Sequence, residues 1–408
     1  MTQKRYFFLI LILGTLTALG PFSIDMYLPG FPAIAQDLKT TVARVSLSLS
    51  SFFIGISAGQ LLYGPLLDRF GRKKPLYVGL VVYILASIGC MSVRSIEALI
   101  VLRFVQAIGS CAAAVASITM VRDLFPVKDN AKVFSLLMLV VGASPMLAPT
   151  VGGYVTAAFG WQSVFLVLSV IAGLILLATV FFLPDSYQPD ASISLKPKPI
   201  LLNFWSVLRE PQFYTYAFTG AVAFSGLFAY VAGSPLVFMD IYRVNGKVYG
   251  WIFAFLSIGL IGSSQLNSWL LKKYRSEQIV FGALVCQVIV GLIFLAGTLA
   301  NLLGLYGTIA MLFLFLSCLG ITNPNAAALS LAPFSKNAGS ASSLMGALQL
   351  GLGTLASVAV SLFSVHSALP MVAIIAVTSL LALLVLIISR KNIAEPIAAA
   401  AETAAVVH

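Results

Sequence analysis

Apolar stretches long enough to cross a lipid bilayer recur along the whole chain of 408 residues. A transmembrane helix needs about 20 predominantly apolar residues, and twelve stretches meet this requirement. Charged residues make up 9% of the chain, whereas roughly 25% is usual in a soluble globular protein. The sequence therefore predicts an all-α polytopic membrane protein. Its expected transmembrane helices cover residues 6–35, 42–67, 75–93, 96–121, 133–159, 161–183, 213–238, 248–271, 278–299, 302–325, 338–365 and 368–389.

The basic residues lie mostly on one side of the expected topology. With a cytosolic N-terminus, 18 of the 24 Lys and Arg residues fall on the cytosolic side, as the positive-inside rule requires. Both termini are therefore expected in the cytosol. The net charge of +11 then reflects topology, and no nucleic-acid partner is expected. The N-terminal segment imitates a cleavable signal peptide, but the spans that follow favour an uncleaved first helix.

The longest polar interruption divides the chain into two halves. Residues 184–212 combine prolines with charged residues, which is typical of a linker. A weak internal repeat, 66–70 against 270–274, lies where two parallel six-helix halves would place it. We therefore expect two pseudo-symmetric six-helix bundles. The expected domains are a first bundle at 1–184, a cytosolic linker at 185–211, a second bundle at 212–391 and a cytosolic tail at 392–408.

Few residues suit metal binding or enzymatic catalysis. The four cysteines lie inside expected spans without the spacing of metal ligands, and the chain has two histidines, so no metal site is expected. The sequence has no phosphate-binding G-x-x-x-x-G-K-[ST] run. It also lacks the clustered carboxylates of many hydrolases. We expect no enzyme activity and no cofactor, with a proton as the coupling ion.

Two ionisable residues, Asp25 and Arg103, lie inside the expected spans and away from their ends. At 1.5 Å per helical residue, Asp25 lies about 15 Å and Arg103 about 10 Å from the outer ends of their spans. A charge in hydrocarbon is costly, so each of these residues requires a partner or a function. We expect both to face one central cavity and to interact directly or through water, with Asp25 as the proton carrier. The alternative is that Asp25 lies near the interface and pairs with a base.

Polar residues follow Arg103 along one face of its helix. Gln106, Ser110 and Ser117 lie at offsets of 3, 7 and 14, and such a stripe faces either a water-filled cavity or a neighbouring helix. The arginine favours the cavity. Further residues are weaker cavity candidates. For the amides an interhelical hydrogen bond is favoured at least as much as contact with cargo, and for the aromatic rings contact with lipid or packing is the more frequent role. These candidates are Asn323, Asn325, Gln349, Gln265, Asn267, Tyr27 and Tyr230.

Glycine and proline are concentrated in the expected span 133–159, which contains Pro149 and the pair Gly152-Gly153. Small residues let helices approach closely, and a proline inside a helix removes a backbone hydrogen bond and favours a kink. The pattern is compatible with a hinge and, equally, with ordinary close packing.

The segment 64–74, Gly-Pro-Leu-Leu-Asp-Arg-Phe-Gly-Arg-Lys-Lys, places five charges between two expected spans. It resembles the signature loop of the major facilitator superfamily. Three further motifs narrow the resemblance to the Bcr/CflA group of bacterial drug:H⁺ antiporters, although Ala148 stands where antiporters usually have glycine. These motifs are Arg103-x-x-Gln106, Ala148-Pro149-x-x-Gly152-Gly153 and the stretch 25–32.

The resemblance implies roles for the residues that carry it. Asp25 would be the proton carrier, and Arg103 would be linked to proton movement. Pro149, Gly152 and Gly153 would form the antiporter interface. A gating loop would latch the two halves together when the cargo site faces outward, although orientation alone is the alternative for its basic residues. That loop consists of Gly64, Asp68, Arg69, Gly71 and Arg72, with Arg122 as the charge partner of Asp68.

The resemblance thus implies proton-driven export of small amphipathic compounds, such as drugs, across a bacterial inner membrane by alternating access. The protein is expected to act as a monomer in the lipid bilayer. Because the expected cavity is poor in acids, neutral, zwitterionic or weakly charged cargo is favoured. A carrier of a metabolite such as a sugar or an amino acid is the alternative within this class. A membrane-embedded sensor or enzyme is the alternative outside it. The sequence leaves the cargo, the proton stoichiometry and the resting conformation open.

Overall fold

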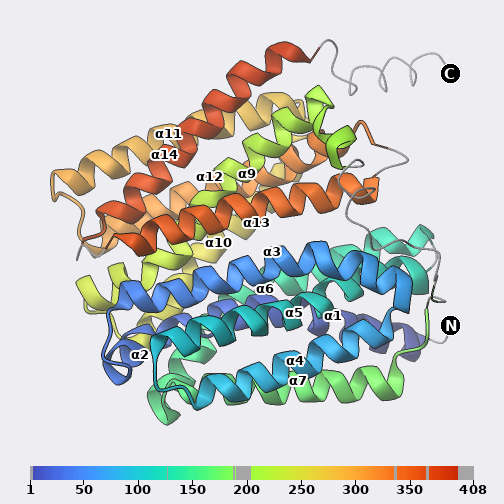
Figure 1. Cartoon of the computed structure of the whole chain (residues 1–408). Coiled ribbons are helices and arrows are strands. Elements are labelled where there is room, and N and C mark those ends of the chain that lie inside the picture. The colour runs from blue at the N-terminus through green and yellow to red at the C-terminus, as the bar shows by residue number, and fades with distance from the viewer. Residues whose placement is uncertain are drawn as a thin grey trace, which may run out of the picture. The chain divides into compact units, whose positions relative to one another are not determined.

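The computed structural model describes residues 3–125, 127–186, 189, 204–334, 338–363 and 367–393. Within these ranges the chain is almost entirely helical (Figure 1). The first expected span consists of α1 (Gln3–Asp25), the 3₁₀ turn η1 (Leu28–Gly30) and α2 (Phe31–Asp37). The other long helices are α3 (Val42–Phe70), α4 (Lys73–Met91), α5 (Ile96–Leu124), α6 (Val127–Phe159), α7 (Gln162–Phe182), α9 (Pro211–Pro235), α10 (Gly246–Leu270), α11 (Ser276–Leu299), α12 (Leu305–Leu331), α13 (Ala338–Leu362) and α14 (Leu369–Ser389).

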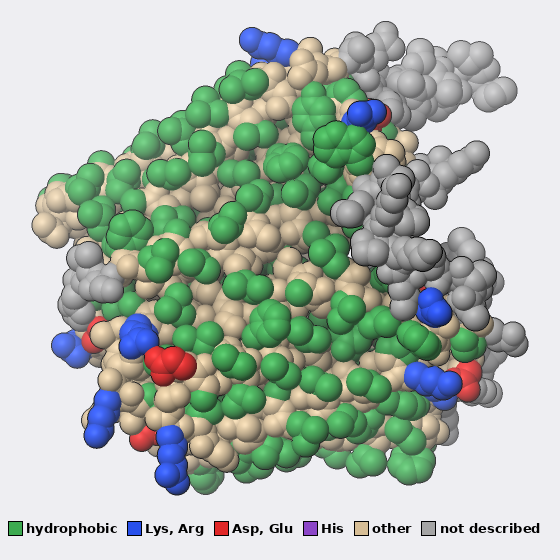
Figure 2. All heavy atoms as spheres, in the orientation of Figure 1, with side chains coloured by type: hydrophobic (Ala, Val, Ile, Leu, Met, Phe, Trp, Pro, Cys, Tyr) green, Lys and Arg blue, Asp and Glu red, His purple; other side chains and the backbone are tan. Residues whose placement is uncertain are grey.

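Eleven helical stretches of the described chain are long and apolar enough to cross a membrane. The remaining long helix, α6, has 33 residues and covers the fifth expected span. The prediction of an all-α polytopic membrane protein is confirmed. Figure 2 is consistent with it, because on the face shown hydrophobic side chains cover the length of the helices and the charged side chains gather near their ends. Such an extensive apolar surface is expected where lipid replaces water.

The first span is interrupted directly after Asp25. Pro29 and Pro32 have no backbone N–H, so they cannot donate the helical hydrogen bonds that would reach back four residues. The chain passes instead through a turn into η1, and the Met26 N–H still bonds to the Phe22 carbonyl at 3.1 Å. The carbonyl groups of the last turn of α1 are therefore free to accept bonds from other side chains.

The described chain groups into two compact units. One unit comprises Met1–Leu195 together with Ser234–Phe255, and the other comprises Lys196–Gly233 together with Leu256–His408. In the first unit α3 and α4 pack along α5, and α1 packs along α6; in the second, α11 packs against α12 and α14. The expected boundaries between two halves stay a prediction, because the segment Ser234–Phe255 of the second expected half groups with the first.

Candidate functional site

Asp25 is the last residue of α1 and is 6% exposed. Among the described residues, no Lys or Arg forms an ion pair with its carboxyl group. Because α1 ends here, the carboxyl group lies beside the irregular turn that carries Met26 and Tyr27. The structure thus buries one acid, without a charge partner in the described chain, at a break in a membrane-spanning segment.

Arg103, on α5, is fully buried and fastened to the end of α1. Its Nη2 donates to the Ser23 carbonyl oxygen at 2.9 Å, and its Nη1 donates to Gln106 Oε1 at 2.5 Å. The partial negative charge at the C-terminal end of a helix is a favourable partner for a cation. Arg103 therefore caps α1 two residues before Asp25.

Aromatic rings surround the same guanidinium group. Its central carbon lies 4.1 Å from the ring centroid of Phe52, 4.6 Å from that of Tyr27 and 5.8 Å from that of Phe165. Cation–π contacts of this kind contribute about 2 kcal/mol when they are desolvated. Tyr27 also hydrogen-bonds Ser48 through its hydroxyl at 2.9 Å. Tyr27, which the sequence suggested as a cavity residue, therefore belongs to the packing around Arg103.

Hydrogen bonds continue from the arginine to α4. Gln106 Nε2 donates to Ser87 Oγ at 2.7 Å, and the Ser87 hydroxyl donates to the Tyr83 carbonyl at 2.8 Å. The hydroxyl groups of Tyr83 and Ser23 are hydrogen-bonded at 2.6 Å. This closed network holds α1, α4 and α5 together at the level of Arg103.

The expected interaction between Asp25 and Arg103 is not a direct ion pair in this structure. The two terminal nitrogens of the guanidinium group donate to an amide oxygen and a backbone carbonyl, and aromatic rings pack on it, whereas its buried Nε atom has no hydrogen-bond partner in the described chain. The polar stripe that follows it is also turned toward helices, since Ser110 is 1% exposed and Ser117 is fully buried. The Ser117 hydroxyl donates to the Leu13 carbonyl of α1 at 2.7 Å.

The glycine pair of α6 lies where backbone meets backbone. A Cβ atom at Gly152 would be 2.1 Å from the Met26 carbonyl oxygen, and one at Gly153 would be 2.4 Å from the Gly246 carbonyl oxygen. Both contacts fall within the first unit. Gly152 thus packs against the residue that follows Asp25, and Gly153 packs against the start of α10.

The sequence did not single out the residues on α10 that complete this packing. A Cβ atom at Gly250 would be 2.8 Å from the Pro149 carbonyl oxygen and 2.6 Å from the Thr150 Cα atom. Tyr249, fully buried beside it, shares a hydrogen bond of 2.8 Å with Ser234. The spacing of Gly246 and Gly250, one helical turn apart, is the signal that could have identified them.

The gating loop forms a compact ion cluster at the end of α3. The Arg72 side chain, 8% exposed, donates from Nε to Asp123 Oδ2 at 2.8 Å and from Nη1 to Asp68 Oδ1 at 2.5 Å. Burial alone would lower the pKa of Arg72, but the hydrogen bonds to Asp123 and Asp68 outweigh it, and the pKa is raised. Gly71 ends α3 with φ of 83°, a left-handed conformation that favours glycine.

The other predicted residues of the gating loop are Arg69, Gly64 and Arg122. The Arg69 guanidinium lies 5.8 Å from the centroid of the Phe70 ring, and a Cβ atom at Gly64 would meet nothing within 4 Å. The side chain of Arg122 lies outside the described residues. Its neighbour Asp123, which the sequence did not identify, is the acid that binds the loop. The latch between the halves stays a prediction.

The cavity candidates of the second unit form their own contacts. Gln349 Nε2, on α13, donates to Asn323 Oδ1, on α12, at 2.8 Å. Asn325 Nδ2 donates to Asn267 Oδ1 at 2.7 Å. Tyr230 is 2% exposed. These four amides thus form the interhelical hydrogen bonds that were the alternative to a role in the cavity, whereas Gln265 is exposed.

Comparisons with known proteins agree with the fold and the motifs. Residues 13–358 match the description Major Facilitator Superfamily. The chain is 34% identical to the bicyclomycin resistance protein homolog of Haemophilus influenzae, over 90% of this chain and 92% of that protein. It is 29% identical to the multidrug resistance protein MdtL of Klebsiella pneumoniae, over 82% of this chain and 83% of that protein.

A solved D-xylose-proton symporter has the same fold, with a TM-score of 0.73 at 13% sequence identity over 94% of this chain and 97% of that one. The long apolar helices and this likeness define the fold of a polytopic membrane protein. The chain belongs to the major facilitator superfamily, and within it to the Bcr/CflA group that its motifs indicated.

Proposed function

We propose that this transporter is a proton-coupled antiporter that exports small amphipathic compounds across a bacterial inner membrane by alternating access. The observation that carries the proposal is the position of Asp25, a buried carboxyl group without an ion pair in the described chain. A carboxyl group that is not tied to a cation can change its proton occupancy when its surroundings change. Asp25 is therefore the proposed proton carrier.

The packing beside Asp25 supplies a link between the proton and the conformation. Met26 follows Asp25, and its carbonyl group is the contact surface for Gly152. Gly153, the next residue, contacts Gly246 on α10. A change of charge at Asp25 acts on the same short backbone segment that α6 covers. Proton exchange and the separation of α6 from α10 are therefore coupled in the proposed cycle.

The proposed cargo follows from the relatives and from the charges of the chain. Two relatives are named for resistance to bicyclomycin and to multiple drugs. Asp25 is the acid that the expected spans place away from their ends, so the interior offers little negative charge to a multivalent cation. Neutral, zwitterionic or weakly charged amphiphiles are the proposed cargo. Efficient export of a permanent dication would contradict this part of the proposal.

The test is the Asp25→Asn variant, expressed in cells that lack their own efflux pumps. Wild-type protein is expected to lower the accumulation of a weakly basic amphipathic dye, and a protonophore is expected to abolish the effect. Asp25→Asn is expected to lose pH-driven export while keeping its abundance in the membrane. Glu97→Gln serves as the matched control, because Glu97 is an exposed acid paired with Arg44. Normal pH-driven export by Asp25→Asn would refute the assignment of the proton carrier.

A further inference from the structure

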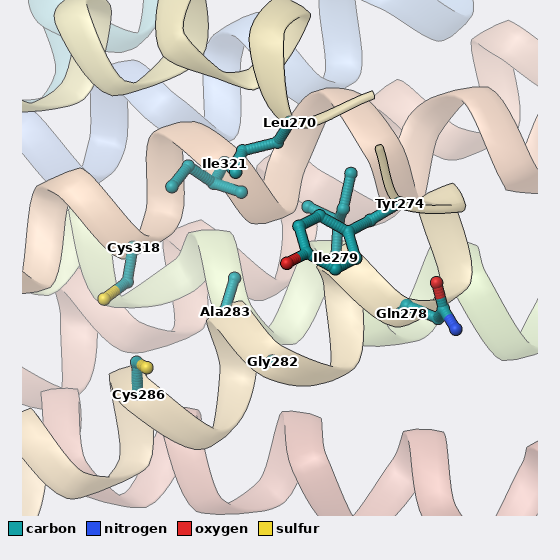
Figure 3. A pocket seen from close by; sticks show the side chains of 9 residues that line it. All are labelled: Leu270, Tyr274, Gln278, Ile279, Gly282, Ala283, Cys286, Cys318 and Ile321. Atoms are coloured by element: carbon teal, nitrogen blue, oxygen red, sulfur yellow. The ribbon is translucent and has the colours of Figure 1, made fainter. Parts of the chain in front are cut away.

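An apolar cavity of about 350 Å³ lies in the second unit, at the junction of α10, α11 and α12 (Figure 3). Sites for small molecules range from about 300 to 1,000 Å³. Gly282 helps to open the cavity, because a Cβ atom there would meet nothing within 4 Å. The residues that line it are Leu270, Tyr274, Gln278, Ile279, Gly282, Ala283, Cys286, Cys318 and Ile321.

The two ends of the cavity differ in polarity. Figure 3 shows the sulfur atoms of Cys286 and Cys318 at one end, and Tyr274 and Gln278 at the other. Gln278 and Cys286 are eight positions apart on α11, which corresponds to about 12 Å along the helix. The cavity therefore runs from the helix ends, where polar groups are found, toward the apolar middle of the membrane. This shape suits an amphiphile with its chain parallel to α11.

Positive charge surrounds the polar end. Lys272 and Lys273 are exposed, and among the described residues neither forms an ion pair. The Lys273 Nζ atom lies 5.5 Å from the centroid of the Tyr274 ring. Arg275 directly precedes α11, whose N-terminus carries a partial positive charge. Even with Glu277 included, residues 272–277 carry a net charge of +2.

We propose that this cavity binds an acyl chain of an anionic phospholipid, with the lipid phosphate held by Lys272 and Lys273. The apolar length of the cavity fits a hydrocarbon chain, and the uncompensated lysines fit a negative headgroup. Juxtamembrane lysines favour anionic over zwitterionic lipid, and Tyr274 is a residue type that gathers at the headgroup level. The proposal concerns lipid alone, so it stands or falls independently of proton coupling and of the exported cargo.

The primary experiment measures the dissociation constant of the first bound lipid by native mass spectrometry of the whole protein in detergent. Dioleoylphosphatidylglycerol is expected to bind more tightly than dioleoylphosphatidylcholine. Lys272→Gln and Lys273→Gln are each expected to weaken phosphatidylglycerol binding about fivefold, and together about 30-fold. Arg94→Gln with Lys74→Gln is the matched control, because both residues are exposed and neither lines the cavity.

A second pair of variants tests the apolar part of the cavity. Gly282→Leu fills it, and the loss of contact with two methylene groups is expected to weaken lipid binding roughly tenfold. Gly262→Leu, on α10, is the control, because a Cβ atom there also meets nothing within 4 Å and Gly262 does not line the cavity. If the two glycine variants are equally stable, a difference in lipid binding between them does not come from a difference in folding.

Thiol labelling supplies an independent readout in the wild-type protein. Cys286 and Cys318 line the cavity, whereas Cys90 and Cys111 are buried. Phosphatidylglycerol is expected to slow the reaction of the lining cysteines with N-ethylmaleimide, and the double lysine variant is expected to lose this protection.

Two results would overturn the proposal. The first is equal affinity for the two lipids. The second is unchanged phosphatidylglycerol binding in the double lysine variant or in Gly282→Leu. If Gly282→Leu keeps lipid binding and also blocks export of an amphipathic dye, the cavity is a path for cargo instead.

Discussion

The substitution Gly153→Ala tests whether the contact between α6 and α10 belongs to one state of the transport cycle. A Cβ atom at Gly153 would lie 2.4 Å from the Gly246 carbonyl oxygen and 2.9 Å from its carbonyl carbon. Ordinary carbon–oxygen contacts in proteins are about 3.3 Å or longer, so α10 must retreat by about 1 Å. Overpacking of this kind costs about 1–3 kcal/mol.

The free-energy cost of Gly153→Ala is expected to apply only to the conformation in which α6 and α10 are in contact, because Gly153 and Gly246 belong to different expected halves of the chain. In a conformation where these segments separate, the added methyl group meets no opposing backbone. A bias of 1–3 kcal/mol changes the ratio of two states roughly 5–150-fold. Gly153→Ala is therefore expected to favour the state in which α6 and α10 are apart and to reduce export.

A cysteine introduced by Thr150→Cys reports on this separation, because Thr150 lies under Gly250 and is half-buried. The background carries Cys286→Ser and Cys318→Ser, and the other native cysteines are buried. A membrane-impermeant maleimide is expected to label the introduced thiol at least fivefold faster when Gly153→Ala is present.

The control for this prediction is Gly173→Ala on α7, where a Cβ atom would meet nothing within 4 Å. It is expected to leave labelling and export unchanged. If Gly153→Ala also leaves both unchanged while the protein remains folded, the contact does not distinguish states of the cycle and the reasoning is refuted.

Four further substitutions test the contacts around the site. Arg103→Lys keeps the charge, but a lysine cannot both cap α1 and lie flat on the aromatic rings. Export by this variant should therefore be slower, with an unchanged midpoint in its dependence on pH. A raised midpoint would mean that Arg103 acts on the proton carrier. Asp123→Asn should lower the free energy of unfolding by about 1.5–3 kcal/mol. Asp68→Asn should lower the free energy of unfolding less, because that carboxylate is 45% exposed. Chemical denaturation of the purified variants measures both values, and a larger loss for Asp68→Asn than for Asp123→Asn would contradict the reasoning. Tyr249→Phe loses the hydrogen bond of its hydroxyl group to α9, which is worth about 1 kcal/mol. This variant should slow export about fivefold in the dye assay. An unchanged export rate would contradict a role of Tyr249 in the packing.

Local patterns in the sequence were sufficient for the helices. The break in the first span was not predicted, because residues 6–35 were expected to form one helix, although its cause is local. Apolar length determines which segments can cross a bilayer, and the prolines at 29 and 32 prevent a continuous helix after Asp25. The left-handed conformation of Gly71 follows from the same kind of local constraint.

The partners of the site residues required tertiary information. Arg122 and Asp123 are adjacent, but neighbouring side chains on a helix point in directions about 100° apart. Sequence alone therefore did not single out Asp123, which the structure places in contact with Arg72 of the gating loop. The same holds for Gly250, because its role depends on which backbone passes beside it. The predicted pair of Arg122 and Asp68 stays a prediction.

The arrangement around Arg103 changes how the two intramembrane charges are understood. A buried cation needs compensation. Here the end of α1, Gln106 and the aromatic rings supply it to all of the guanidinium group except the Nε atom, which has no partner in the described chain. Asp25 is therefore not required to balance Arg103. A proton can bind to or leave Asp25 without breaking an ion pair, so the cost of each proton step is set by the surroundings of the carboxyl group. In the proposed cycle those surroundings would change when α6 and α10 move, which would tie the proton step at Asp25 to the contact made by Gly153.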